Sequence, residues 1–100
     1  MLSFVCSGWW EQIPLGRQPM NDLELAFEDG RVVGIGHDIV GEFELRGEIK
    51  EDSIYLRKQY IGKHVIDYHG TSMGEGGYGG QWSCNGIPGG RWFMRVLRQV

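Results

Sequence analysis

The residues best suited to chemistry lie between positions 54 and 68, where an amine and two phenols stand among apolar residues. Ile54 and Leu56 alternate with polar residues, a pattern typical of a half-buried β-strand. Continuing this alternation places Lys58 and Tyr60 on the same inner face. An inward amine must be paired, lose its proton or reach solvent. Lys58 therefore marks either the mouth of a barrel or a binding site.

The turn after Tyr60 decides which side chains join this inner face. A three-residue turn over 61–63, with Gly62 at positive φ, pairs Tyr60 with His64 and Lys58 with Ile66. The inner face then holds Lys58, Tyr60, His64, Ile66 and Tyr68.

A two-residue turn is the alternative register. It would place Lys63, Val65 and Asp67 inside and would allow Lys58 to meet Asp67. We favour the three-residue turn because it directs Gly70 inward and Asp67 outward.

The favoured inner face suggests a ligand class. One ammonium, one imidazole and two phenols near one end suit a small anionic or carbonyl-bearing molecule. Lys58 would supply charge, the phenols and His64 would supply hydrogen bonds, and Trp10 and Trp82 would form an apolar wall. The structural alternative is a solvated mouth above two core tyrosines whose hydroxyls bond to backbone carbonyls.

Other chemistry receives less support from the sequence. His37 and Asp38 are adjacent, so on a regular strand they point to opposite faces and cannot share a metal ion. Ser72 does not lie in a G-x-S-x-G elbow, and no helix follows the glycines of 74–80 to offer an N-terminus to phosphate. We expect no metal, no cofactor and no catalytic residue. An isomerase-like or hydrolase-like barrel with His64 as the base is a further alternative.

Length and charge restrict the function classes. One hundred residues predict a single domain, 1–100. The net charge of -3 argues against a nucleic-acid partner. No apolar run approaches the length of a membrane span and the first residues do not resemble a signal peptide, so we expect a cytoplasmic protein without membrane contact. Cys6 and Cys84 lack C-x-x-C spacing and are expected to be free thiols, with a disulfide as the alternative.

Period-2 alternation predicts an all-β fold. Turn signals divide the chain into eight short strands at about 3–13, 20–28, 31–38, 42–50, 53–60, 64–72, 77–84 and 91–98. Eight strands joined in order by tight turns predict an antiparallel up-and-down meander closed into a small barrel, with a two-sheet sandwich as the alternative.

The Asp29-Gly30 turn sets one register. It pairs Glu28 with Arg31 and places Leu25 beside Gly34 and Leu23 beside Gly36. A sharply coiled sheet needs inner-face positions without a Cβ, and glycine provides them. Aromatic rings or a ligand are expected to fill the space beside these glycines.

Short glycine-aromatic units give the chain a resemblance to a known group. Gly8-Trp9-Trp10 places Trp10 in the Gly-x-Trp register with which calycin barrels begin. Leu45-Arg46-Gly47, Tyr68-His69-Gly70 and Gly80-Gln81-Trp82 resemble units that avidin-like chains repeat. The sequence thus resembles a small calycin-type barrel of the avidin/streptavidin-like group.

This resemblance implies a barrel, and an arginine of the last strand (Arg91, Arg95 or Arg98) over Trp10. It does not imply biotin binding, because only Ser7, Gln12 and Asp38 match the polar set that holds the ureido group in that family.

Outward-facing apolar residues suggest association. Trp9, Val33 and Ile35 are neighbours of residues expected to face inward, so their side chains are expected to point outward. Exposed apolar surface of this size often marks an interface. Avidin-like barrels pair through outer faces, so the resemblance also implies a homodimer or homotetramer. The alternative function is therefore a protein-protein interaction or self-assembly module with a filled barrel interior.

Overall fold

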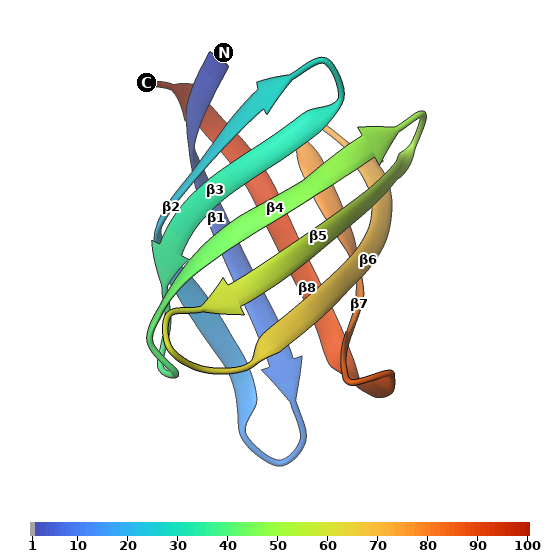
Figure 1. Ribbon diagram of the computed structural model, residues 1–100. Helices are drawn as coiled ribbons and strands as arrows, with labels where there is room; N and C mark the ends of the chain where they lie inside the picture. Colours follow the sequence, from blue (N-terminus) through green and yellow to red (C-terminus); the bar gives the residue numbers. More distant parts are fainter. Residues whose placement is uncertain (1) are drawn as a thin grey trace.

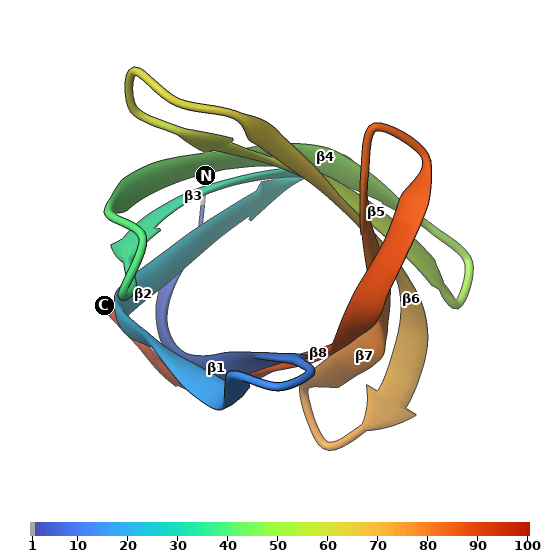
Figure 2. The same ribbon diagram turned by 90° about the horizontal axis from the view of Figure 1, so that it is seen from below.

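The computed structural model describes residues 2–100 as one closed antiparallel barrel (Figure 1). The strands are β1 (Leu2–Gln12), β2 (Gly16–Glu28), β3 (Arg31–His37), β4 (Glu42–Lys50), β5 (Ser53–Tyr60), β6 (Val65–Gly74), β7 (Gly77–Cys84) and β8 (Ile87–Gln99). Each strand pairs with the next, and β8 returns to pair with β1, which closes the ring seen in Figure 2. The predicted up-and-down barrel is confirmed.

Two strands begin earlier than the sequence predicts. β2 begins at Gly16 and β8 at Ile87, whereas the sequence analysis places their starts at 20 and 91. The turns before them are tighter than expected, because Gly16, Asn85 and Gly86 adopt positive φ angles and reverse the chain in a few residues. These turns extend the β1–β2 and β7–β8 pairs toward one end of the barrel.

The register predicted from the Asp29-Gly30 turn is confirmed as far as Glu24 and is interrupted by a bulge beyond it. Leu25 lies opposite Gly34, as expected. Beyond Glu24 the pairing shifts, so that Asn21 rather than Leu23 is the next partner of β3 and lies opposite His37. Asp22, at a φ of 49°, lies in this bulge.

The favoured register between β5 and β6 is confirmed. Lys58 lies opposite Ile66, and Leu56 lies opposite Tyr68. Gly62 has a φ of 72° in the turn between the strands, as the three-residue turn requires. Asp67 points outward, where its carboxylate accepts a hydrogen bond from the Tyr55 hydroxyl at 2.7 Å.

Inner glycines allow close approach of neighbouring strands and rings. A Cβ at Gly47 would overlap the carbonyl oxygen of Tyr55 on β5. A Cβ at Gly70 would collide with the Gly79 backbone and lie 2.7 Å from the Trp92 ring. The backbone of the neighbouring strand therefore fills the space beside these glycines, together with the Trp92 ring at Gly70.

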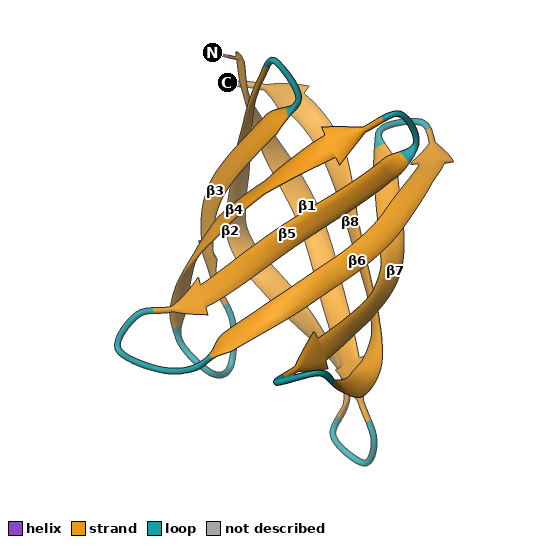
Figure 3. Ribbon diagram, turned by 45° about the vertical axis from the view of Figure 1, so that its right-hand side comes forward, coloured by secondary structure: helices purple, strands orange, loops and turns teal. Residues whose placement is uncertain are grey.

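The loops that could surround an opening lie at one end of the barrel (Figure 3). Residues 13–15, 38–41, 61–64 and 85–86 connect strands at the end away from the two termini. No helix among residues 2–100 is long and apolar enough to cross a membrane.

Candidate functional site

Asp38 is the centre of a buried polar cluster near the mouth. It follows β3, and its backbone exchanges hydrogen bonds with Gly41 in a tight turn. Its Oδ1 accepts a bond from the Val40 amide at 2.9 Å, which points the carboxylate into the barrel. Its Oδ2 accepts bonds from Lys58 Nζ at 2.6 Å, the Tyr60 hydroxyl at 2.7 Å and the Trp10 indole at 3.0 Å.

Lys58 is the cation of this cluster. Its side chain and that of Asp38 are both 0% exposed, so the ion pair is removed from solvent. Nζ also donates to the Tyr68 hydroxyl at 3.0 Å and lies 4.3 Å from the centroid of the Phe43 ring. The amine is thus held by one carboxylate, one phenol and aromatic faces.

The hydroxyl proton of Tyr68 is bonded only weakly and is free to bond to a stronger acceptor. Its oxygen accepts the bond from Lys58, and within residues 2–100 its proton is donated only to the Met20 sulfur, at 4.0 Å. A thioether is a weak acceptor. The ring stacks on Trp92 with centroids 5.0 Å apart, which holds the hydroxyl in place.

A cavity of about 190 Å³ opens above this cluster. Trp10 and Trp82 lie in its wall with ring centroids 6.1 Å apart and nearly perpendicular. The Trp82 indole donates to the Glu11 carbonyl at 2.9 Å, and Gly89 leaves room for its ring. The full lining is Trp10, Gln12, Val40, Tyr60, His64, Ile66, Tyr68, Trp82 and Cys84.

The predicted site residues occupy two levels of this region. Trp10, Tyr60, His64, Tyr68 and Trp82 line the cavity. Lys58, also predicted as a site residue, does not line the cavity and lies behind its wall, bonded to Asp38 and Tyr68. His64 is exposed at the rim, with its ring centroid 5.1 Å from that of Tyr60.

The central position of Asp38 in this cluster was not predicted from the sequence. Residue 38 was predicted to end the strand 31–38, in which Gly34, Gly36 and Asp38 share the inward parity, but Asp38 was not considered as a partner of Lys58. An inward lysine needs a buried acid, and extending this parity by two residues would have identified it. Gln12, Val40 and Cys84 were also not predicted as cavity residues.

The arginine expected over Trp10 is replaced by Lys58. Arg91 and Arg95 alternate on β8 with the buried residues Trp92 and Met94, and so point outward. Lys58 Nζ lies 5.6 Å from the centroid of the Trp10 ring. The cation beside this tryptophan therefore comes from β5.

The two thiols are free, as the sequence analysis expects. Burial raises the pKa of Cys6 to about 11, so this thiol remains protonated near neutral pH. Cys84 is half-buried at the cavity, and its sulfur donates to the Val65 carbonyl.

Burial and pairing shift the pKa values of the cluster in opposing ways. Burial lowers the pKa of Lys58 from 10.5 to about 8, although the hydrogen bond and charge of Asp38 act against this change. Burial alone would raise the pKa of Asp38, but the hydrogen bond and charge of Lys58 outweigh it and hold that pKa below 3.8. Burial and Asp38 raise the pKa of Tyr60 and Tyr68. The ion pair is therefore complete at neutral pH.

The lowered pKa of Lys58 predicts a pH dependence of stability. Between about pH 8 and 10.5 the folded state binds fewer protons at Lys58 than the unfolded chain does, so this group makes the unfolding free energy rise with pH. Urea denaturation at about pH 7.5 and 9.5 should show a gain of about 1–2 kcal/mol relative to a Lys58→Met variant. Cys6 and the tyrosines titrate in both proteins, and comparison with the double variant Asp38→Asn, Lys58→Met, which also lacks the Asp38 carboxylate, should give the same gain. Equal pH slopes in the two proteins would contradict the assignment.

Comparisons with known proteins found no matching family model, no matching curated protein and no matching solved structure.

Proposed function

We propose that the barrel binds a small single-ring molecule, bearing a carbonyl-type oxygen, in the mouth cavity. The observation that carries this proposal is the cavity of about 190 Å³ between Trp10 and Trp82. An apolar cavity of about 150 Å³ is enough to hold benzene. Aromatic walls with a few placed polar groups are the usual composition of a small-molecule site.

The charges of the cluster favour an uncharged ligand over an anionic one. Asp38 already compensates Lys58 at 2.6 Å, so an anion would have to compete with a buried carboxylate for the amine. The Asp38 oxygens accept bonds from Trp10, Tyr60, Lys58 and the Val40 amide, which leaves little acceptor capacity for a ligand donor. The Tyr68 proton, donated only to sulfur, would bond better to a carbonyl oxygen.

We also propose that the barrel is of calycin type and avidin-like. The strand order and closure are compatible with such a barrel. Trp10 of the Gly8-Trp9-Trp10 unit is buried and bonded to Asp38, which suits the role of a structural tryptophan on the first strand.

The ligand contacts can be tested with benzamide and toluene as probes. Tyr68→Phe is expected to weaken benzamide binding by about threefold to tenfold and to leave toluene binding unchanged, because only benzamide can accept the Tyr68 proton. Trp82→Ala is expected to weaken both probes by about tenfold or more, because it removes the cavity wall. Ligand-observed NMR titration measures both effects.

Trp9→Ala is the matched control for Trp82→Ala. Trp9 lies on the outer surface, stacked on Phe93, and should not affect either probe. If neither probe binds the native protein at millimolar concentration, or if Trp9→Ala and Trp82→Ala have equal effects, the proposal is wrong.

A further inference from the structure

Cys84 is a nucleophile in the wall of the mouth cavity that the proposed binding of a carbonyl compound does not use. It ends β7, is half-buried, and lines the cavity together with Tyr68 and His64. Its thiol is free, and its sulfur donates a weak hydrogen bond to the Val65 carbonyl at 3.6 Å. The sulfur is therefore available to a molecule bound in the cavity.

Cys84 and Tyr68 lie on neighbouring strands and face the same interior. Tyr68 on β6 pairs with Trp82 on β7. Cys84 follows Trp82 by two residues, so it shares the inner face and takes the diagonal position relative to Tyr68. The Cα atoms of diagonal neighbours are about 7–8 Å apart. A single-ring molecule between the two side chains can thus contact the Tyr68 hydroxyl with one end and the Cys84 sulfur with the other.

The Tyr68 hydroxyl is arranged to stabilise negative charge on a ligand oxygen. Tyr68 is 1% exposed, and burial and Asp38 raise its pKa, so the hydroxyl keeps its proton at neutral pH. Lys58 Nζ donates to this hydroxyl at 3.0 Å, and a bond from a cation makes the hydroxyl a stronger donor in turn. A fixed donor in a buried site acts as an oxyanion hole.

From this arrangement we infer that the mouth cavity is a site of covalent addition, in which Cys84 adds to a single-ring α,β-unsaturated carbonyl compound. The inference rests on the proposed function, because the same Tyr68 contact orients the carbonyl oxygen. The sulfur bonds to the β-carbon of the ligand, and the electron pair of the C=C bond moves toward the oxygen to give an enolate that Tyr68 stabilises. The thiol proton returns at the α-carbon of the ligand, so no oxidant, reductant or other co-reactant is required.

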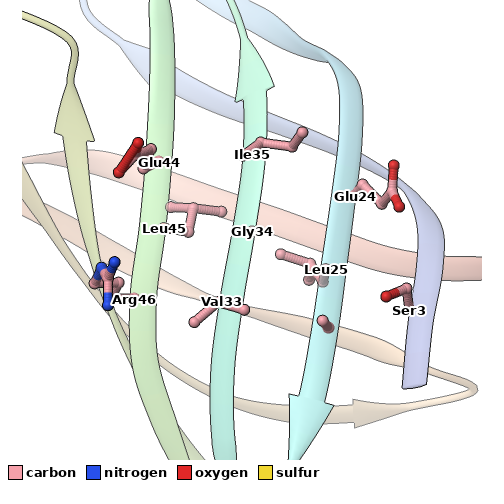
Figure 4. Close-up of a pocket in the computed structure, with 10 residues that line it drawn as sticks. Ser3, Glu24, Leu25, Val33, Gly34, Ile35, Glu44, Leu45 and Arg46 are labelled. Carbon is pink, nitrogen blue, oxygen red and sulfur yellow. The ribbon is translucent and has the colours of Figure 1, made fainter. Parts of the chain in front are cut away.

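A second hollow shows by contrast what this chemistry needs. It has a volume of about 300 Å³ and lies on the outer surface of β2, β3 and β4, around Val33 and Ile35 (Figure 4). Glu24, Glu44 and Arg46 border it, and its lining within the described part of the chain holds no cysteine and no aromatic side chain. It offers neither a thiol nor a phenol, so Ile35 is a suitable control position.

The test follows the addition of cyclohexenone, a single-ring conjugated ketone, by intact-protein mass spectrometry. The native protein is expected to gain the mass of one cyclohexenone, which peptide mapping places on Cys84. The reaction should be at least about tenfold faster than that of free cysteine at the same pH, because the cavity holds the reacting atoms together. Benzamide, which competes for the cavity, is expected to slow it.

Cys84→Ala is expected to abolish the addition, and Cys6→Ala is its matched control. Cys6 is buried and is not part of the cavity lining, so its replacement should leave the rate unchanged, as should Ile35→Ala in the outer hollow. Circular dichroism of each variant confirms that the barrel is intact.

Tyr68→Phe tests the stabilisation of the enolate. This variant is expected to slow the addition by about tenfold or more, because it removes the donor to the developing charge. Alkylation of Cys84 by iodoacetamide forms no enolate, so it should keep its native rate in the variant. Equal slowing of both reactions would show only a loss of access to the sulfur and would overturn the role of Tyr68.

The outcomes separate this inference from the proposed function. If benzamide binds but cyclohexenone adds to Cys84 no faster than to free cysteine, the inference is wrong and the proposed function stands. If benzamide does not bind and the addition is also no faster, both are wrong. An addition that Cys6→Ala slows as much as Cys84→Ala does would also overturn the inference.

Discussion

Replacing Asp38 with asparagine is expected to lower the unfolding free energy by about 3–5 kcal/mol. The substitution conserves the shape of the side chain and leaves an acceptor for Trp10 and Tyr60. It removes the charge that compensates Lys58, whose side chain is 0% exposed and has only the Tyr68 hydroxyl as another hydrogen-bond partner. Urea denaturation monitored by tryptophan fluorescence measures the change.

The double variant Asp38→Asn, Lys58→Met is expected to be much more stable than Asp38→Asn alone. Removing both charges eliminates the cost of burying an unpaired ion, and replacing a buried pair as a unit is often nearly neutral. The coupling energy from the double-mutant cycle should be about 2–3 kcal/mol or more. If the two single effects simply add, Asp38 and Lys58 do not act as a pair and the description of the cluster is wrong.

Gly47→Ala is expected to destabilise the barrel by about 3 kcal/mol or more. Gly47 lies on β4 opposite Leu56, and an added Cβ would overlap the carbonyl oxygen of Tyr55. That oxygen belongs to the backbone of β5 and cannot move aside like the end of a flexible side chain, so the two strands must separate. Thermal melting and urea denaturation measure the loss.

Glu48→Ala is the matched control for Gly47→Ala. Glu48 is the next residue of the same strand and is exposed on the outer surface, so its replacement should change stability by no more than about 0.5 kcal/mol. A Gly47→Ala protein as stable as this control would contradict the close approach of β4 and β5.

Local sequence patterns predicted most of the strands because alternation and turn chemistry act over a few residues. The Asp29-Gly30 turn correctly paired Leu25 with Gly34. The bulge at Asp22 was missed, although the pattern of β2 signals it: Met20 and Leu23 are both buried at a spacing of three, which breaks the period of two. This bulge interrupts the regular pairing predicted between Leu23 and Gly36, although Leu23 is buried on the inner face as expected.

The candidate site was predicted less completely because its central contact joins distant segments. Lys58 was recognised as an inward amine from its own strand, but its partner Asp38 lies 20 residues earlier, beyond the end of β3. On the neighbouring strand, the acid available to Lys58 was Asp67, which faces outward. Closure of the barrel brings several strands to one point, and pairing of adjacent strands does not reveal which residues meet there.

The beginning of β1 and the end of β8 lie side by side at the end of the barrel opposite the mouth (Figure 1). The Val100 amide donates a hydrogen bond to the Ser3 carbonyl at 2.9 Å, so a short linker could join the ends without stretching β1 or β8. New ends could then be opened in the 51–52 turn, which is also away from the cavity. A circular permutant of this kind should keep the same ring of strand pairs, because the fold depends on which strands are neighbours and not on the order in which they are synthesised.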